Sequence, residues 1–275
     1  MKPYEYWEWK VEAPYREWLA AWLDAFPFTG IEETPDGLRA YADPQHPVTD
    51  FHLPDFLRDH VEWVGKGTLS PRNWNALWEQ NFPPLVINDV LIYAPFHQVE
   101  PAAYRHAICI EPAMAFGTGH HASTRLMLRL MRHLPLAGKE VIDWGCGTGI
   151  LAIYAEKLGA RKVWAVDNYA LALDNTRHNM HLNRTQRITA CGVEHLADIP
   201  AVDVILANIE RNTLLQLMND FRRRLRTGGH IAFSGIMAQD RPLLHAAARS
   251  AGFVITSEQD EAEWHAFTAV KTEDT

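Results

Sequence analysis

The chain has 275 residues, of which 47% are hydrophobic and 22% are charged, and its formal net charge is −8. This balance is typical of a globular protein and excludes disordered or fibrous chains, and the length leaves room for two domains of ordinary size. No stretch reaches the roughly 18 to 20 apolar residues that cross a bilayer, and the acidic start MKPYEYWEWKVE lacks the basic and then apolar pattern of a signal peptide. We therefore expect a cytoplasmic protein with no membrane partner.

The net negative charge is concentrated in the first third of the chain. Residues 1–95 hold 15 acidic and 7 basic side chains, whereas the other 180 residues hold 19 of each. An acidic module beside a neutral one suits a basic partner and disfavours nucleic acid as the direct substrate, because phosphates are bound by clustered lysine and arginine. An acidic surface that only keeps the chain soluble explains the charge equally well.

Residues 1–95 are predicted to form a small α+β domain. The expected elements, in chain order, are a strand at 4–11, a helix at 18–26, a hairpin at 29–42, a second helix at 53–64 and a closing strand at 86–93. This order fits a split βαβ, ferredoxin-like fold. Seven tryptophans in this part are interpreted as core residues and not as ligand contacts. They are Trp7, Trp9, Trp18, Trp22, Trp63, Trp74 and Trp78.

Residues 96–275 alternate more regularly and are predicted to form the second domain. Helices are expected at 123–134, 149–158, 170–182 and 212–225, and strands at 140–143, 163–167, 187–191, 203–207, 230–234, 253–258 and 264–271. Strands that alternate with helices predict a parallel sheet with right-handed crossovers and helices on both faces. The last two strands are expected to pair antiparallel at its edge. The predicted fold class is a doubly wound, Rossmann-like α/β sheet.

The segment VIDWGCGTG ends a predicted strand with Asp143 and then turns through Gly145, Gly147 and Gly149 into a helix. Glycines allow a tight turn and a close approach of the backbone to a nucleotide-like ligand. A dinucleotide site needs GxGxxG so that its pyrophosphate meets the helix N-terminus, whereas this turn reads GxGxG. The Asp143 carboxylate also suits the ammonium of a methionine moiety better than a pyrophosphate. The segment therefore favours S-adenosylmethionine over NAD.

Two further acids follow the next strands of the predicted sheet. Asp167 ends the strand VWAVD, 22 residues after Gly145. A carboxylate there can accept both ribose hydroxyls of NAD or of S-adenosylmethionine, although a strand-end aspartate can also act only as a helix cap. Glu194, after the third strand, is a candidate acceptor for an adenine amino group or simply an exposed loop acid.

The segment AFGTGHHAST, residues 115–124, is a glycine-bearing loop that leads into a helix. Its glycines allow it to fold over a ligand, and the hydroxyls of Thr118, Ser123 and Thr124 are candidate helix caps. The adjacent His120 and His121 point in different directions and have no evident third ligand, so no metal is predicted there.

Asn208 lies in the segment LANIE, at the end of the fourth predicted strand of the sheet. Ligands of open α/β sheets lie beyond the carboxyl ends of the strands, which places Asn208 where a transferred methyl group would be. Its amide oxygen can accept a hydrogen bond from an attacking amine and orient the nitrogen lone pair. A cap on the helix that begins near Asn212 explains this asparagine equally well.

Four segments, VIDWGCGTGILAI, VWAVD, VDVILANIERNTL and AFGTGHHAST, resemble the bacterial ribosomal-protein methyltransferases of the PrmA type, which modify large-subunit ribosomal protein eleven. The resemblance is close over residues 105–240. It implies that the front domain recognises the ribosomal protein and positions its amines for repeated methylation. It also implies a loop, Phe116 to Gly119, that closes over the ligand. The cofactor contacts that it implies are Thr124, Gly145, Asp167 and Asn208.

The residues and the resemblance together predict an S-adenosylmethionine-dependent protein N-methyltransferase acting on lysine or N-terminal amines of a basic ribosomal protein. Asn208 and Thr124 are the predicted catalytic residues. The predicted cofactor contacts are Phe116, Gly117, Thr118, Gly119, Thr124, Asp143, Gly145, Gly147, Asp167 and Asn208. The alternatives are an amine methyltransferase with another protein or an RNA substrate, a catalytically silent scaffold of the same fold, and an NAD oxidoreductase.

Overall fold

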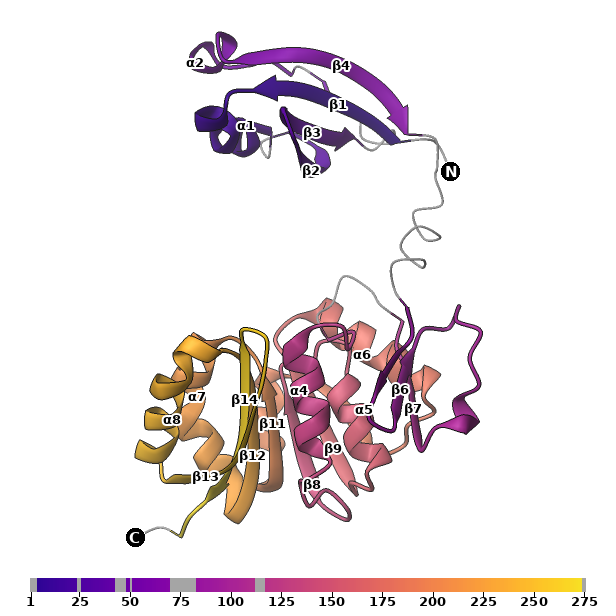
Figure 1. Cartoon of the computed structure of the whole chain (residues 1–275), viewed down its shortest axis with the longest axis vertical. Helices are drawn as coiled ribbons and strands as arrows, with labels where there is room; N and C mark the ends of the chain where they lie inside the picture. Colours follow the sequence, from indigo (N-terminus) through magenta and orange to yellow (C-terminus); the bar gives the residue numbers. More distant parts are fainter. Residues whose placement is uncertain are drawn as a thin grey trace. The chain divides into compact units, whose positions relative to one another are not determined.

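The computed structural model describes residues 4–23, 26–42, 48–49, 51–69, 83–111 and 117–273. The chain forms two compact units, residues 1–82 and 83–275 (Figure 1). No helix within the described ranges is both long enough and apolar enough to cross a membrane.

The division between the units precedes the domain boundary expected at residue 95. Strand β5 (Leu85–Ile87) pairs with β6 (Val90–Tyr93), and β6 runs parallel to β7 (His106–Cys109). Ile87 and Ile92 are buried in the core of the second unit. The strand expected to close the first domain therefore belongs to the second, because its apolar side chains are buried there.

The first unit is a four-stranded antiparallel sheet with two helices. Its elements are β1 (Tyr4–Val11), a 3-10 turn (Ala13–Tyr15), α1 (Arg16–Leu23), β2 (Phe28–Thr34), β3 (Gly37–Ala42), α2 (Asp55–Arg58) and β4 (Val61–Leu69). The strand order is β2-β3-β1-β4, so β3 lies between the two strands that α1 connects. This is the split βαβ arrangement expected from the sequence. The predicted hairpin is present, with Thr34 opposite Gly37.

The second helix predicted at 53–64 is wrong, because α2 has only four residues and β4 starts at Val61. β4 pairs with β1 along its whole length, from Tyr4 opposite Leu69 to Val11 opposite Val61. The segment VEWVGKGTL contains β-branched side chains and two glycines, which disfavour a helix. Pairing with β1 then fixes it as an extended strand.

The core of the first unit is rich in aromatic residues. Trp9 is 1% exposed, and its ring lies 5.3 Å from the ring of Trp63 on the neighbouring strand. Three tryptophans pack in or against this core, as expected: Trp7, Trp9 and Trp22. Trp18 and Trp63 are exceptions, since they are 62% and 46% exposed. Trp74 and Trp78 lie outside the described residues.

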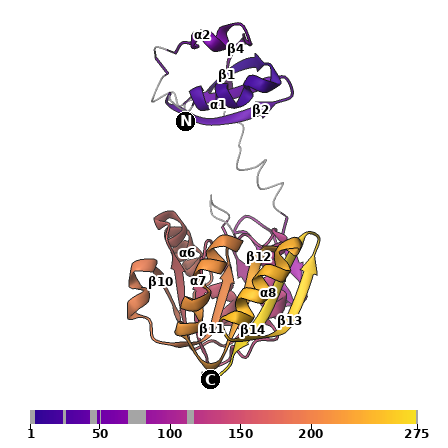
Figure 2. The same ribbon diagram turned by 90° about the vertical axis from the view of Figure 1, so that its left-hand side faces the viewer.

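The second unit contains a seven-stranded sheet with helices on both faces (Figures 1 and 2). Its strands are β8 (Glu140–Trp144), β9 (Lys162–Asp167), β10 (Ile188–Gly192), β11 (Val202–Asn208), β12 (Leu225–Met237), β13 (Phe253–Glu261) and β14 (Trp264–Lys271). Its α-helices are α4 (Ala122–Met131), α5 (Ile150–Lys157), α6 (Ala170–Leu182), α7 (Arg211–Arg224) and α8 (Arg241–Ser250).

The strand order is β10-β9-β8-β11-β12-β14-β13. The first five strands in this order are parallel, and β14 pairs antiparallel with both β12 and β13. The predicted doubly wound sheet and its antiparallel edge pair are therefore confirmed. A parallel sheet brings the carboxyl ends of its strands to one edge, so the ends of β8, β9 and β11 lie near one another.

Alternation along the central strands divides the core into two layers. In β11, Val204 and Leu206 pack in the cluster that contains α4, α5 and α6. Ile205 and Ala207, between and after them, pack in the cluster that contains α7 and α8. Successive side chains of a strand point to opposite faces. Because helices cover both faces of this sheet, every position of its central strands must be apolar, without alternating polar residues.

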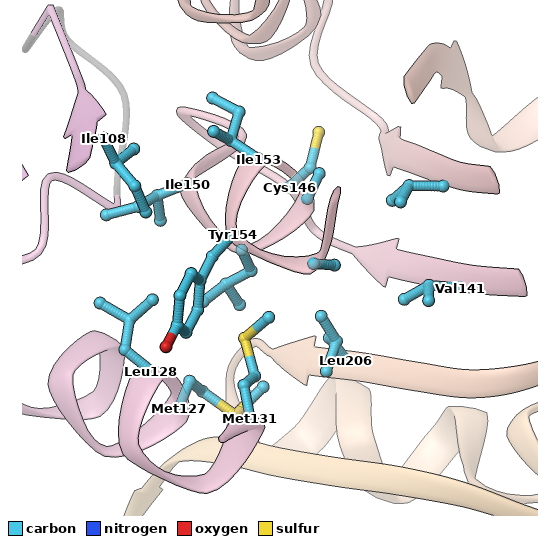
Figure 3. Close-up of a cluster of buried hydrophobic side chains, with 14 of the residues drawn as sticks. Ile108, Met127, Leu128, Met131, Val141, Cys146, Ile150, Ile153, Tyr154 and Leu206 are labelled. Atoms are coloured by element: carbon cyan, nitrogen blue, oxygen red, sulfur yellow. The ribbon is translucent and has the colours of Figure 1, made fainter. Parts of the chain in front are cut away.

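Tyr154 of α5 lies at the centre of the first of these clusters. Figure 3 shows its ring between Met127, Leu128 and Met131 of α4 and the side chains that line α5. The residue is fully buried, and its hydroxyl has no hydrogen-bond partner within the described part of the chain. Burial raises the pKa of Tyr154 to about 12.

The variant Tyr154→Phe is expected to be as stable as the parent chain or more stable by about 1 kcal/mol. An unpaired buried hydroxyl costs roughly 1 to 3 kcal/mol of desolvation, and phenylalanine keeps the ring that fills the core. Tyr154→Ala removes that ring and is expected to cost about 3 to 5 kcal/mol. Denaturant unfolding of both variants checks this. A Tyr154→Phe variant that loses 2 kcal/mol would show that the hydroxyl is bonded.

Candidate functional site

The glycine turn joins the end of β8 to the start of α5. The amides of Gly145 and Cys146 both donate to the carbonyl of Val166 on β9, at 2.8 and 3.1 Å. Gly145 has φ +73°, and a Cβ at this position would lie 2.3 Å from Cγ2 of Ile209. The positive φ and the close approach of Ile209 both exclude a side chain at this position. Only glycine therefore allows the turn to pack this closely against the strand ends.

Helix α6 braces this turn with residues that sequence reasoning missed. The Thr176 hydroxyl donates to the carbonyl of Gly147 at 2.9 Å, and the Asn179 amide donates to the carbonyl of Thr148 at the same distance. Asn179 also accepts from the amide N–H of Glu111, just after β7. Both side chains are fully buried. The sequence signal for this brace is the spacing of three residues between Thr176 and Asn179, which places both on one face of a helix.

Asp143, at the end of β8, is buried beneath the turn. Its Oδ2 accepts a hydrogen bond from the amide of Ala152 at 2.9 Å, in the first turn of α5. Its Oδ1 is buried without a hydrogen-bond partner among the described residues. Burial raises the pKa of Asp143 to about 7, although the Ala152 hydrogen bond opposes the shift. One oxygen thus binds a backbone amide in the first turn of α5, and the other remains available as an acceptor.

This raised pKa makes a pH-dependent contribution to the stability of the ligand-free protein. Between about pH 4 and 7 the folded chain binds more protons at Asp143 than the unfolded chain, so the free energy of unfolding falls as pH rises. We expect Asp143→Asn to remove this fall and to be more stable than the parent at pH 8, by roughly a few kcal/mol. Thermal unfolding from pH 4 to 8 measures the difference. A parallel pH dependence in the two proteins would contradict the assignment.

Asp167 lies at the end of β9 and is 7% exposed. Its Oδ2 accepts from the amide of Gly147 at 3.0 Å, and its Oδ1 accepts from the amide of Tyr169 at 3.1 Å. A carboxylate has about four lone-pair positions, so it can still accept from two hydroxyl groups. The aspartate therefore braces the turn and keeps acceptor capacity for a ribose.

Glu194 lies beyond the end of β10, in a 3-10 turn (Val193–Asp198). Its carboxylate folds over Gly192, where a Cβ would lie 2.2 Å from Oε1. Its side chain is 70% exposed. Glu194 is thus at the same edge of the sheet as the other candidates, and its carboxylate lies 3.6 Å from Nε2 of His195.

Asn208 is the last residue of β11 and is 9% exposed. Its Nδ2 donates to Oγ1 of Thr124 at 3.4 Å, and Thr124 is fully buried in the first turn of α4. Its Oδ1 is buried and has no partner in the part of the chain that the structure describes. The helix-cap alternative is wrong, because α7 begins at Arg211 with Glu210 as its N-cap. The two predicted catalytic residues are therefore in contact.

The loop before α4 docks on the glycine turn. Oγ1 of Thr148 donates to the carbonyl of Gly117 at 2.6 Å. The N-cap of α4 is His121, whose Nδ1 accepts from the amide of Ser123, so the expected hydroxyl cap is replaced by an imidazole. This corrects the cap prediction, since the ring of His121 reaches the same amide that a hydroxyl would. Phe116 lies outside the described residues.

The acceptors at this edge of the sheet suit a ligand that carries hydrogen-bond donors. Among the described residues at the ends of β8, β9 and β11, two buried side-chain atoms lack a hydrogen-bond partner, Oδ1 of Asp143 and Oδ1 of Asn208, and both are acceptors. They fit an ammonium and an incoming amine, and they do not fit a pyrophosphate, which offers only acceptors. The strand order, the glycine turn and the strand-end acid together define a class I methyltransferase, which uses S-adenosylmethionine as methyl donor.

The chain belongs to the family of ribosomal protein L11 methyltransferases (PrmA), whose family model matches residues 49–272. A ribosomal protein L11 methyltransferase of Porphyromonas gingivalis is 39% identical over 261 residues, which cover 90% of this chain and 88% of that protein. One of Phocaeicola vulgatus is 37% identical over 80% of this chain and 78% of its own length. The crystal structure of a ribosomal protein L11 methylase from Lactobacillus delbrueckii subsp. bulgaricus aligns with a TM-score of 0.64 and 27% identity, covering 69% of this chain and 99% of that one. The resemblance noted in the sequence is confirmed.

Proposed function

We propose that this chain methylates amine nitrogens of ribosomal protein L11, on lysine side chains or on the N-terminal amine. The proposal is supported by the names of its relatives, which are methyltransferases of that protein. The observation that carries it is Oδ1 of Asn208, which has no partner among the described residues. The side chain is held at the tip of β11 because its Nδ2 donates to Thr124. An acceptor fixed at this point suits a substrate N–H.

S-adenosylmethionine supplies an electrophilic methyl group when it is bound. We assign its ribose to Asp167, its ammonium to Asp143, and its remaining contacts to the glycine turn and to the loop from Phe116 to Gly119. Asn208 receives an N–H of the substrate amine and so directs the nitrogen lone pair. Its amide cannot take up a proton, so the amine must arrive uncharged.

The protonation state of the substrate sets part of the barrier. A lysine amine with a pKa of about 10.4 loses its proton at neutral pH at a cost of roughly 4 to 5 kcal/mol, whereas an N-terminal amine with a pKa of about 7.7 to 8.0 costs far less. The rest of the rate comes from holding nitrogen and methyl carbon in line, which is the role we assign to Asn208 and Thr124.

The acidic first unit is the part that we assign to substrate recognition. Residues 1–82 carry 14 acidic and 7 basic side chains, which suits a basic ribosomal protein. The relative of Porphyromonas gingivalis matches 90% of this chain, so the match extends into this unit. Charge complementarity of this kind mainly raises the association rate and weakens with salt.

The test offers purified, unmethylated L11 and ribosomal RNA to the full chain with labelled S-adenosylmethionine. We expect label in the protein and not in the RNA, and mass spectrometry of the labelled L11 then identifies the modified amines. The matched control is Asn208→Ala, which should bind cofactor but leave L11 unlabelled. Label in RNA alone, or in L11 at side chains other than amines, would refute the proposal.

A further inference from the structure

Three potential metal ligands meet at one corner of the second unit. His245 comes from α8, Glu258 from β13 and His265 from β14, three elements that pack together (Figure 2). Nε2 of His245 lies 3.1 Å from Nε2 of His265 and 3.6 Å from Oε2 of Glu258. All three candidate ligand atoms lie within 4.8 Å of one another.

Two of the three separations are close to those around a tetrahedral metal ion. With ligand bonds of about 2.0 to 2.1 Å, two donors of a tetrahedral zinc site lie about 3.3 to 3.4 Å apart. The measured 3.1 and 3.6 Å fall on either side of this value. Two imidazoles and one carboxylate are also a ligand set that zinc uses with a fourth position left to water.

A fourth residue orients the most deeply buried ligand. Nδ1 of His265 lies 2.6 Å from Oδ1 of Asp260, and His265 is fully buried. A carboxylate on one ring nitrogen keeps the proton there and leaves the lone pair of the other nitrogen free to bind a metal. The nitrogen left free here is Nε2, which faces His245. The Asp260–His265 pair thus has the arrangement that commonly supports metal-binding histidines.

We propose that His245, Glu258 and His265 bind one divalent transition-metal cation, zinc by the nature of the ligands, with Asp260 as the positioning residue. The ion would reach the site from an open surface hollow whose lining includes His245, Arg249 and Glu258. The bound ion would link α8 to the hairpin formed by β13 and β14.

A basic residue competes with the metal for the same carboxylate. Arg241 forms an ion pair with Glu258 and lies 3.7 Å from Oδ2 of Asp260. Arg241 contacts Oε1 of Glu258 and the metal would use Oε2, but its positive charge disfavours a second cation beside it. Loss of the arginine should therefore tighten metal binding. If the cluster were only an ion-pair network, the same loss would weaken the network and would not create metal affinity.

The site is distinct from the proposed methyl-transfer residues but lies at the same edge of the sheet. His265 is opposite Ile236 near the end of β12, and β12 is the strand beside Asn208. The same hairpin carries Glu261, which binds Arg125 and Arg129 of α4. The metal would thus stiffen a hairpin on which the helix of Thr124 is anchored.

The experiment titrates zinc chloride into the full chain after chelator treatment and dialysis, with calorimetry and elemental analysis as readouts. We expect one zinc ion per chain with a Kd below micromolar and a higher Tm in its presence. Glu258→Gln, at a side chain that is 40% exposed, should weaken binding at least tenfold without disturbing the core. His265→Ala should abolish binding, and Arg241→Gln should tighten it.

The matched control is His178→Ala, which removes a half-exposed histidine that also pairs with a glutamate, Glu111, far along the chain from this cluster. It should leave zinc binding unchanged. The absorption spectrum of the cobalt-loaded protein reports tetrahedral nitrogen and oxygen ligands and would reveal a thiolate site. No binding at 100-fold molar excess of zinc, or equal binding by Glu258→Gln and the parent chain, would overturn the proposal.

Discussion

Replacement of Asn208 by alanine should reduce methyl transfer by roughly two to four orders of magnitude while the affinity for S-adenosylmethionine stays within several-fold. The Oδ1 of Asn208 is buried, has no partner in the described part of the chain and is held by Thr124. Its free acceptor can act on a substrate N–H that is present only during transfer. The loss should therefore fall on turnover and not on cofactor binding.

Single-turnover transfer to L11 and calorimetry with S-adenosylhomocysteine separate these two quantities. Asn208→Asp keeps an oxygen at the position of Oδ1 and should lose less activity than alanine. Thr124→Val preserves the shape of the buried side chain but removes the hydrogen bond that fixes the amide, so it should lie between the parent and Asn208→Ala. Methyl transfer at the parental rate by Asn208→Ala would remove this residue from the mechanism.

The parallel sheet was predictable because its strands are buried on both faces. Apolar runs such as 202–208 and 162–167, separated by amphipathic helices, leave one consistent arrangement, and these two strands agree with the predicted ones within one residue at each end. The strand predicted at 230–234 is longer in the structure, where it spans Leu225–Met237. The first unit was harder. Residues 61–69 contain two glycines and no regular apolar alternation, and they are fixed as a strand by pairing with β1.

The domain boundary predicted at residue 95 differs from the division after residue 82 for a related reason. Residues 83–95 resemble the end of the preceding domain along the sequence, but their pairing partner, β7, lies after them. The amino-acid composition of a segment does not indicate which strand the segment pairs with. The burial of Ile92 in the core of the second unit shows that the segment belongs to that unit.

The candidate site was predictable to the extent that topology alone places it. Asp143, Asp167 and Asn208 end strands of one parallel sheet, and such ends meet at one edge. The brace by Thr176 and Asn179 was not predicted, because it depends on which face α6 turns toward the glycine turn. The cluster proposed to bind zinc was missed because its members come from three elements and have no local ligand spacing.

Replacement of Asp167 by alanine is expected to weaken S-adenosylhomocysteine binding by about 10- to 100-fold, since a hydrogen bond to a charged group contributes roughly 1.5 to 3 kcal/mol. The structure adds a second effect. The carboxylate also accepts from the amides of Gly147 and Tyr169, so alanine leaves both of these donors without their acceptor. Part of the lost affinity should therefore come from a loosened glycine turn.

Asp167→Asn separates the two effects, because its amide oxygen still accepts one of these backbone bonds while its NH₂ group cannot accept from a ribose hydroxyl. We expect thermal stability nearer to the parent than that of alanine, and an affinity for S-adenosylhomocysteine that is still reduced about tenfold. Calorimetry and thermal unfolding of the three proteins provide the comparison. If Asp167→Asn bound as tightly as the parent, the carboxylate would serve the turn alone, and the ribose would have to be held by another group at the strand ends.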